Sequence, residues 1–122
     1  MARLRYLEAL RKALRDEMLL DESVFVLGED VEVGTRGLTT GLLEEFGSER
    51  VKDTPISEAG FVGFATGAAM EGRRPVVEFQ INTMVFQAFD QIVNNAAKFH
   101  LMSGGGLRVP VTYIFPASGA AL

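Results

Sequence analysis

The sequence contains no cysteine, no tryptophan and a single histidine, His100, among its 122 residues. Without cysteine the chain has no disulfide, no thiol nucleophile and no thiolate metal ligand, which fits a reducing compartment. One histidine without cysteine also excludes zinc sites of the usual kind. His100 comes late in an apolar stretch that we expect to be helical, so we interpret it as a packing or surface residue.

Long apolar runs and clustered basic residues are also missing. No uninterrupted apolar run reaches the ~18 residues that a membrane span needs. Charged residues, among them Arg3, Arg5 and Glu8, interrupt the N-terminal region, so it carries no apolar signal segment. The net charge of −4 and the scattered Lys and Arg residues argue against a nucleic-acid partner. We expect a cytoplasmic protein that binds neither membrane nor nucleic acid.

The glycine fingerprints of nucleotide-binding folds do not occur. Residues 28–34 follow an apolar run but do not match G-x-G-x-x-G, and their three acids would repel a pyrophosphate. The glycines at 104–106 lack the Lys and Ser or Thr of a phosphate-binding loop. A dinucleotide enzyme is therefore disfavoured. The acidic run Glu29-Asp30-Val31-Glu32 is most simply interpreted as a solvated loop.

The sequence does contain enough apolar residues, 48%, to build a core, and its periodicity alternates between helix and strand. We expect helices over 4–20, from about 39 or 40 to 46, over 58–71 and over 84–101, and extended segments over 24–27, 51–54, 75–80 and 109–115. The first helix should pack on the core through its apolar residues between Tyr6 and Met18, which recur every three or four positions. The last helix should pack through Phe86, Phe89, Ile92, Val93 and Ala96. Such alternation predicts a single α/β domain with a parallel sheet.

The most informative segment is Thr54–Ala69. A turn-prone Thr-Pro pair leads to Ser57, a good helix N-cap, which places the carboxylate of Glu58 in the first helical turn. Gly63 and Gly67 on one side of this helix allow another backbone to come close. The segment predicts an acidic group at the edge of a closely packed interface.

Six stretches of the chain resemble one protein family, the β subunit of the thiamine-diphosphate-dependent component of 2-oxoacid dehydrogenase complexes. They are Tyr6-Leu7-Glu8-Ala9-Leu10; Val26-Leu27-Gly28-Glu29-Asp30-Val31; Gly41-Leu42-Leu43 with Phe46-Gly47 and Arg50-Val51; Asp53-Thr54-Pro55-Ile56-Ser57-Glu58-Ala59-Gly60-Phe61; Arg74-Pro75-Val76-Val77-Glu78-Phe79; and Phe89-Asp90-Gln91-Ile92-Val93-Asn94 with Ala97-Lys98. The resemblance is to the N-terminal part of that subunit.

The resemblance implies a fold and a set of site residues. The family's pyrimidine-binding domain is a doubly wound parallel sheet, and residues 1–122 are expected to form its N-terminal portion. Glu58 matches the glutamate that hydrogen-bonds a ring nitrogen of the aminopyrimidine, shares a proton with it and so activates thiamine diphosphate. Further cofactor contacts are expected from Ile56, Gln80, Met84 and Gln87.

The resemblance also implies partners. An α-type subunit would share the cofactor and hold its diphosphate and a divalent metal such as magnesium, and the backbone of Val111 would bind a structural monovalent cation. A second β subunit, giving α2β2, and a lipoyl acyltransferase core complete the expected assembly. The reaction would be oxidative decarboxylation of pyruvate or a branched-chain 2-oxo acid with acyl transfer to a lipoyl carrier, with this chain inactive alone.

The chain departs from the family pattern in three places. Met84 stands where relatives stack an aromatic ring on the aminopyrimidine, and the segment 114–119 lacks the arginine with which the family segment usually begins. The chain also stops at residues 118–122, just past a strand, so we expect it to be completed by a partner or to be part of something longer. Two alternatives stay open: an acetoin-cleaving or transketolase-like thiamine enzyme half, and a non-catalytic assembly module.

Overall fold

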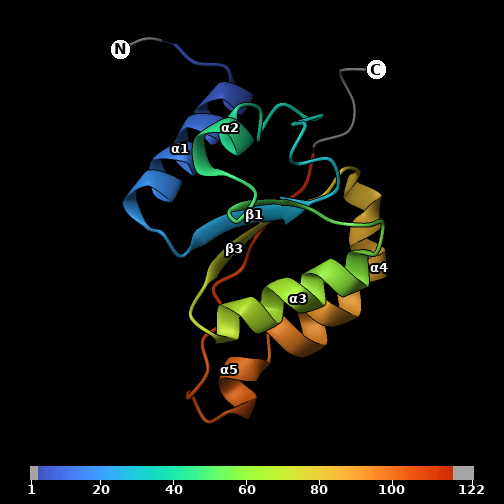
Figure 1. Cartoon of the computed structure of the whole chain (residues 1–122). Coiled ribbons are helices and arrows are strands. Elements are labelled where there is room, and N and C mark those ends of the chain that lie inside the picture. The colour runs from blue at the N-terminus through green and yellow to red at the C-terminus, as the bar shows by residue number, and fades with distance from the viewer. Residues whose placement is uncertain (1–2, 117–122) are drawn as a thin grey trace.

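A computed structural model of the chain describes residues 3–116 and shows an α/β fold (Figure 1). Its helices are α1 (Tyr6–Leu20), α2 (Leu42–Phe46), α3 (Glu58–Met70), α4 (Val85–Asp90) and α5 (Phe99–Met102), with a 3-10 turn η1 (Asn82–Met84) and a π-helix η2 (Gln91–Ala96) on either side of α4. Its strands are β1 (Val24–Gly28), β2 (Val51–Asp53), β3 (Arg74–Glu78) and β4 (Thr112–Ile114). The unusual ending, residues 118–122, lies outside the described residues.

The strands of the described region form one parallel sheet in the order β2-β1-β3-β4. Figure 1 shows α1 and α2 on one face of this sheet and α3, α4 and α5 on the other. Each parallel connection crosses over through one of these helical layers, as parallel pairing requires. The parallel α/β architecture expected from the alternation of helix and strand is therefore confirmed. Within residues 3–116, no helix is long and apolar enough to cross a membrane.

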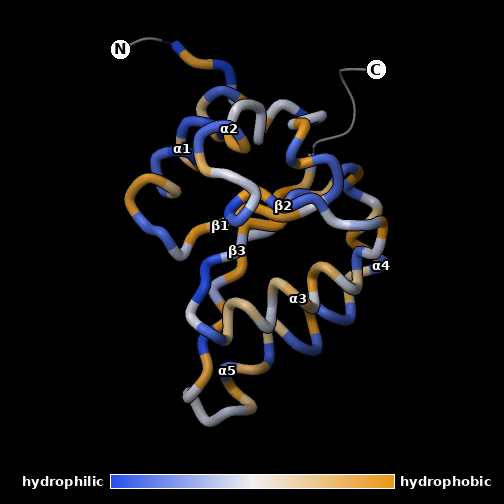
Figure 2. Tube along the Cα trace, viewed as in Figure 1, coloured by the Kyte–Doolittle hydropathy of each residue, from blue (hydrophilic) through white to orange (hydrophobic). Residues whose placement is uncertain are grey.

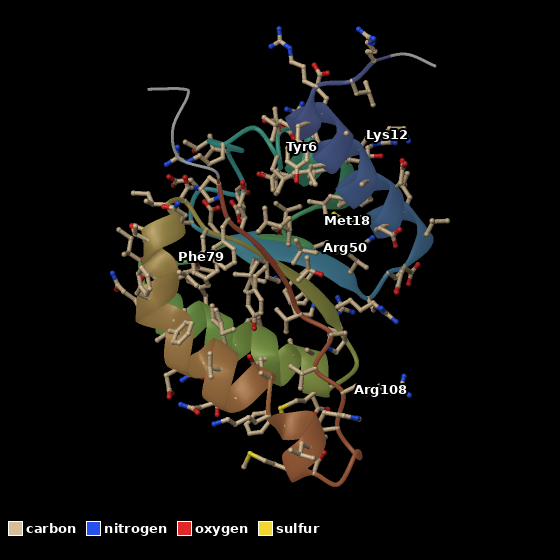
Figure 3. The ribbon with its side chains drawn as sticks, turned by 180° about the vertical axis from the view of Figure 1, so that it is seen from behind. Tyr6, Lys12, Met18, Arg50, Phe79 and Arg108 are labelled. Atoms are coloured by element: carbon tan, nitrogen blue, oxygen red, sulfur yellow. The ribbon has the colours of Figure 1, made fainter. Side chains whose placement is uncertain are left out.

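The sheet separates two apolar cores, because neighbouring residues of β1 and β3 point to opposite faces. Val26 and Val76 face α1, where Met18 is fully buried. Leu27 and Val77 face α3 in the second core. Figure 2 shows the hydrophobic segments gathered along the central strands, and Figure 3 shows Phe79 between the sheet and the helices of the α3 layer. Burial of both sheet faces explains why β1 is a continuous apolar run.

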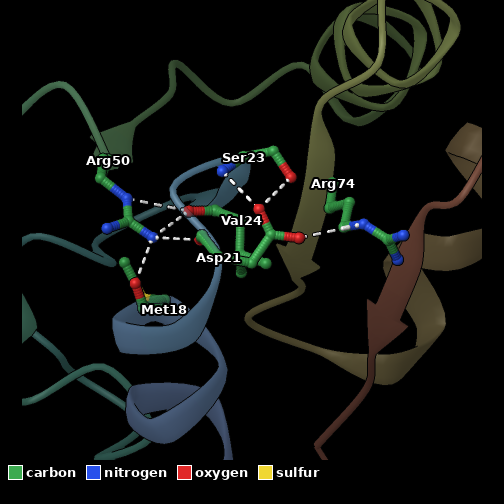
Figure 4. Close-up of polar contacts among 6 residues, drawn as sticks. All are labelled: Met18, Asp21, Ser23, Val24, Arg50 and Arg74. Atoms are coloured by element: carbon green, nitrogen blue, oxygen red, sulfur yellow. Dashed lines mark hydrogen bonds and ion pairs between the residues drawn. The ribbon is translucent and has the colours of Figure 1, made fainter.

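Helix α1 buries only part of its expected apolar face. Leu14 and Met18 are buried, whereas Tyr6 is 81% exposed and Leu7 is also exposed. The C-terminal end of α1 is held by Arg50, whose guanidinium donates to the carbonyl oxygens of Met18 at 2.7 Å, Asp21 at 2.9 Å and Val24 at 2.7 Å (Figure 4). The bond to Met18 satisfies a carbonyl group that the end of α1 leaves without a partner, and the other two tie that end to the start of β1.

The expected helix over 84–101 is wrong as a single helix. The chain passes from α4 into the π-helix η2, where the backbone N–H of Ala97 bonds the carbonyl of Ile92 at 2.9 Å, and resumes as α5. The wider π turn shifts the helical face. Ala88 is the buried residue of α4, whereas Phe86 and Phe89 are 75% and 53% exposed. The prediction that these two phenylalanines pack inward is wrong.

Three shorter expectations also need correction. Ser57 occupies the N-cap of α3, but its side chain makes no cap hydrogen bond. The N-cap of α2 is Gly41, at φ 84°, rather than Thr39 or Thr40. Strand β4 covers 112–114 instead of 109–115, since Pro110 has no N–H to donate to a ladder.

Candidate functional site

The candidate site lies at the carboxyl edge of the sheet. Gly28 pairs with Asp53 on one side and with Glu78 on the other, so β1, β2 and β3 end at the same level. Helix α3 begins five residues after β2, which brings its first turn to this edge. Ligands of open α/β sheets bind outside the carboxyl ends of the strands.

A tight turn after β1 brings Glu29 into the protein. A side chain on Gly28 would place its Cβ 2.2 Å from the carbonyl oxygen of Glu78, so only glycine fits there. Asp30 adopts a left-handed conformation with φ 54°. Between them, Glu29 is only 8% exposed, and its interpretation as part of a solvated loop is wrong.

Glu58 occupies the first turn of α3 and is only 2% exposed. Among the described residues, its Oε1 atom has no hydrogen-bond partner, and the same is true of Oε1 of Glu29. Burial raises the pKa of the Glu29 carboxyl, and repulsion from Glu58 and then from Asp30 raises that pKa further. The site thus holds two buried acids close enough to repel one another.

Gln80 joins the ends of β1 and β3 through both ends of its side-chain amide. Its Nε2 donates to the backbone carbonyl of Glu29, and its Oε1 accepts a hydrogen bond from Nε of Arg36 at 3.0 Å. Nearby Glu78 is 4% exposed. Its burial raises the pKa of its carboxyl to about 7, and the positive charge of Arg36 opposes this rise.

The other predicted site residues fall into two groups. Ile56, 81% exposed, precedes α3, Met84 lies in η1 beside the second core, and Gln87 is exposed on α4. These segments follow the carboxyl ends of β2 and β3, as do Glu58 and Gln80. Val111 instead precedes β4, at the opposite edge of the sheet, where its N–H bonds the carbonyl of Val109 at 2.9 Å.

The arrangement suits a nitrogen heterocycle better than a metal. A buried carboxyl oxygen without a partner, as in Glu58, can exchange a proton or a hydrogen bond with a ring nitrogen. In the described part of the chain, no group of three or more His, Cys, Asp or Glu could hold a metal ion. The side chains present therefore fit the aminopyrimidine portion of a cofactor.

Sequence reasoning missed Arg36 and Glu78, and it misread Glu29. The position of Glu29 directly after a buried strand was a usable signal, because carboxyl ends of parallel strands meet at one edge. Glu78 interrupts an apolar strand, which was a second signal. Arg36 sits in a glycine-flanked loop and carried no signal of its own.

The sequence as a whole matches one known family. A family model described as "Transketolase, pyrimidine binding domain" matches residues 2–121. The chain belongs to this family of transketolase-type pyrimidine-binding domains, which confirms the expected domain type.

Within that family, the chain is similar to subunits named "Pyruvate dehydrogenase E1 component subunit beta". It is 53% identical over 116 residues to that of Rickettsia conorii, which covers 93% of this chain and 35% of the relative. The values for Rhizobium meliloti are 50% over 123 residues, 99% and 27%. For the mitochondrial beta-2 subunit of Oryza sativa they are 50% over 116 residues, 93% and 31%. The resemblance to the N-terminal part of such subunits is confirmed, and the chain spans about a third of their length.

Proposed function

We propose that this chain is the pyrimidine-binding part of a pyruvate dehydrogenase-type β subunit. The reaction is the oxidative decarboxylation of a 2-oxo acid, with transfer of the acyl group to a lipoyl carrier. The observation that carries the proposal is the buried Glu58 carboxyl at the start of α3, whose Oε1 atom has no partner within residues 3–116. The similarity to β subunits with that name supports the same conclusion.

Glu58 acts on the aminopyrimidine. When bound, thiamine diphosphate supplies a thiazolium ring that serves as an electron sink for decarboxylation. The Glu58 carboxyl would hold a proton at a ring nitrogen of the aminopyrimidine, as a general acid–base group does. Its burial excludes water from that hydrogen bond, which strengthens it. Ile56, Met84 and Gln87 follow strands that end at the same edge of the sheet. Gln80 keeps a second N–H and a second oxygen lone pair for the cofactor beside its two bonds within the chain.

An α-type subunit shares the cofactor and supplies the diphosphate and magnesium ligands. The similarity to subunits named as the beta subunit of an E1 component supports such a partner. Exposed apolar side chains on α3 and α4, namely Phe64, Phe86 and Phe89, offer a surface for that subunit or for a second β subunit. Beside Phe64, a pocket of about 320 Å³ opens between β2 and α3. The lipoyl acyltransferase core, the α2β2 stoichiometry and a monovalent cation at Val111 stay predictions.

The cytoplasmic location also stays a prediction. The relatives from Rickettsia and Rhizobium carry no organelle in their names, whereas the rice relative is named mitochondrial.

Glu58→Gln tests the proposed function, because it keeps the shape of the side chain and removes the acid. In a complex reconstituted with an α-type subunit, proton exchange at the thiazolium carbon should fall by about 10²–10⁴-fold, the range of general acid–base effects. Glu49→Gln is the matched control, since that side chain is 92% exposed. Equal exchange rates in parent and Glu58→Gln would leave Glu58 as a helix-capping acid.

The same experiment separates the alternatives. An assembled parent complex that binds no thiamine diphosphate would favour the non-catalytic assembly module. Cofactor activation without turnover of 2-oxo acids, but with cleavage of acetoin or a ketose, would favour the other thiamine enzymes.

A further inference from the structure

The side chain of Gln80 forms hydrogen bonds with both ends of the loop that follows β1. Gln80 donates to the carbonyl of Glu29, where the loop begins, and accepts from Arg36, seven residues further along the chain. Both bonds use the same side-chain amide, so neither end can move without disturbing the other. We refer to these three residues, Arg36, Gln80 and Glu29, as the clasp.

The loop inside the clasp depends on external support. Asp30 adopts a left-handed backbone conformation with φ 54°. For any residue other than glycine, this conformation raises the free energy of the folded state. Its carbonyl accepts hydrogen bonds from the backbone N–H groups of Gly34 at 3.0 Å and Thr35 at 3.4 Å. A second attachment joins Glu32 to β2, since the N–H of Glu32 donates to Oδ1 of Asp53 at 2.8 Å. The turn is therefore held from β2 and β3 together.

The clasp holds the backbone from which the Glu29 carboxyl projects. The Glu29 carboxyl is buried, and its Oε1 atom has no hydrogen-bond partner among the described residues. Repulsion from Glu58 adds to burial in raising the pKa of this carboxyl. Burying an acid without a partner costs free energy, so a fixed backbone favours the buried position of this side chain over an exposed one. Arg36 is itself held over the sheet edge, since its positive charge acts on Glu78 as well as donating to Gln80.

We propose that Arg36 and Gln80 are positioning residues that hold the loop at 30–36 and keep the Glu29 carboxyl buried at the sheet edge where Glu58 begins α3, so that cofactor activation depends on this loop. This inference rests on the proposed function for its link to cofactor activation. The clasp itself is a property of the chain without cofactor.

Four variants of the assembled enzyme test the proposal. Arg36→Met and Gln80→Leu break the clasp, and Arg36→Lys keeps a cation that can donate to Gln80. Arg108→Met is the matched control for loss of one positive charge: Arg108 is exposed and precedes β4, near α5 at the opposite end of the sheet (Figure 3).

The first measurement is amide hydrogen exchange without cofactor. In Arg36→Met and Gln80→Leu the amides of Gly34 and Thr35 should exchange at least about tenfold faster, because their bonds to Asp30 open more often. The Arg108→Met protein should match the parent. Unchanged exchange in both clasp variants would overturn the proposal.

The second measurement separates positioning from cofactor contact. In Arg36→Met, proton exchange at the thiazolium carbon should fall about tenfold, a part of the 10²–10⁴-fold that acid–base groups contribute. The Kd for thiamine diphosphate should change by less than about threefold, and Arg36→Lys should restore the exchange rate. A loosened loop with the parent's exchange rate overturns the positioning role. Failure of the parent to bind cofactor would instead overturn the proposed function, which the loop measurement does not depend on.

Discussion

Glu78 is a carboxyl group kept out of water inside the end of a strand. Its pKa of about 7 lies well above the usual value of 4.5 because of burial. Between these two pH values the unfolded chain loses a proton that the folded chain retains, so the free energy of unfolding falls as pH rises. The expected loss from this one group is about 3 kcal/mol, complete near pH 7 and absent below pH 4.5.

The free energy of unfolding of Glu78→Gln, measured by urea unfolding at pH values from about 4 to about 8, tests this effect. The variant should be more stable than the parent near neutral pH, and the difference should vanish in acid. Glu49→Gln, at an exposed position, should follow the parent at every pH. A constant difference between parent and Glu78→Gln across the whole range would mean that Glu78 ionises normally in the fold.

At the scale of elements, Gly63 and Gly67 of α3 have different surroundings. A Cβ on Gly63 would lie 3.3 Å from Oε1 of Gln91, so this position packs against η2 of the same chain. A Cβ on Gly67 would meet nothing within 4 Å. The close approach of a second backbone, predicted for both positions, is therefore left open only at Gly67.

Gly67→Leu should block assembly with an α-type subunit while leaving the helix content of the chain unchanged. Gly67→Ala is the matched control, and it should stabilise the chain by about 0.5–1 kcal/mol through helix propensity. Analytical size exclusion with the partner and circular dichroism of the chain alone provide the two readouts. An assembly that tolerates leucine at position 67 would remove this face of α3 from the interface.

The elements also show what could be predicted from sequence. The run 24–27 and the Thr-Pro turn before Glu58 were placed correctly, because continuous apolar residues and proline act locally. The place of Glu29 after a buried strand indicated the sheet edge, but its bond to Gln80, 51 residues away, could not be predicted from local sequence. The π-helix η2 breaks an apolar pattern that fits one straight helix equally well. Glu58 was recognised from a family motif, whereas its unpartnered oxygen required the fold.

For the molecule as a whole, the apolar surface is uneven. Phe64, Phe86 and Phe89 are 58%, 75% and 53% exposed, and α3 and α4 pack against one another in the same layer. Clustered exposed aromatics favour association. We therefore expect the isolated chain to self-associate at micromolar concentration through this exposed apolar surface.

Sedimentation velocity of Phe86→Ser with Phe89→Ser should show a clear shift toward monomer. Tyr6→Ser is the control, because Tyr6 is 81% exposed but lies on α1, on the other face of the sheet. A parent chain that sediments as a cooperative monomer would show that this surface does not drive association.

The arginine at the end of α1 has a consequence for the order in which the chain becomes structured. Arg50 lies 32 residues after Met18 and 26 after Val24, whose carbonyl groups it binds. These bonds can form only when Arg50, directly before β2, reaches the start of β1. We therefore expect the end of α1 to gain its stability together with β1 and β2, and not from the helix alone.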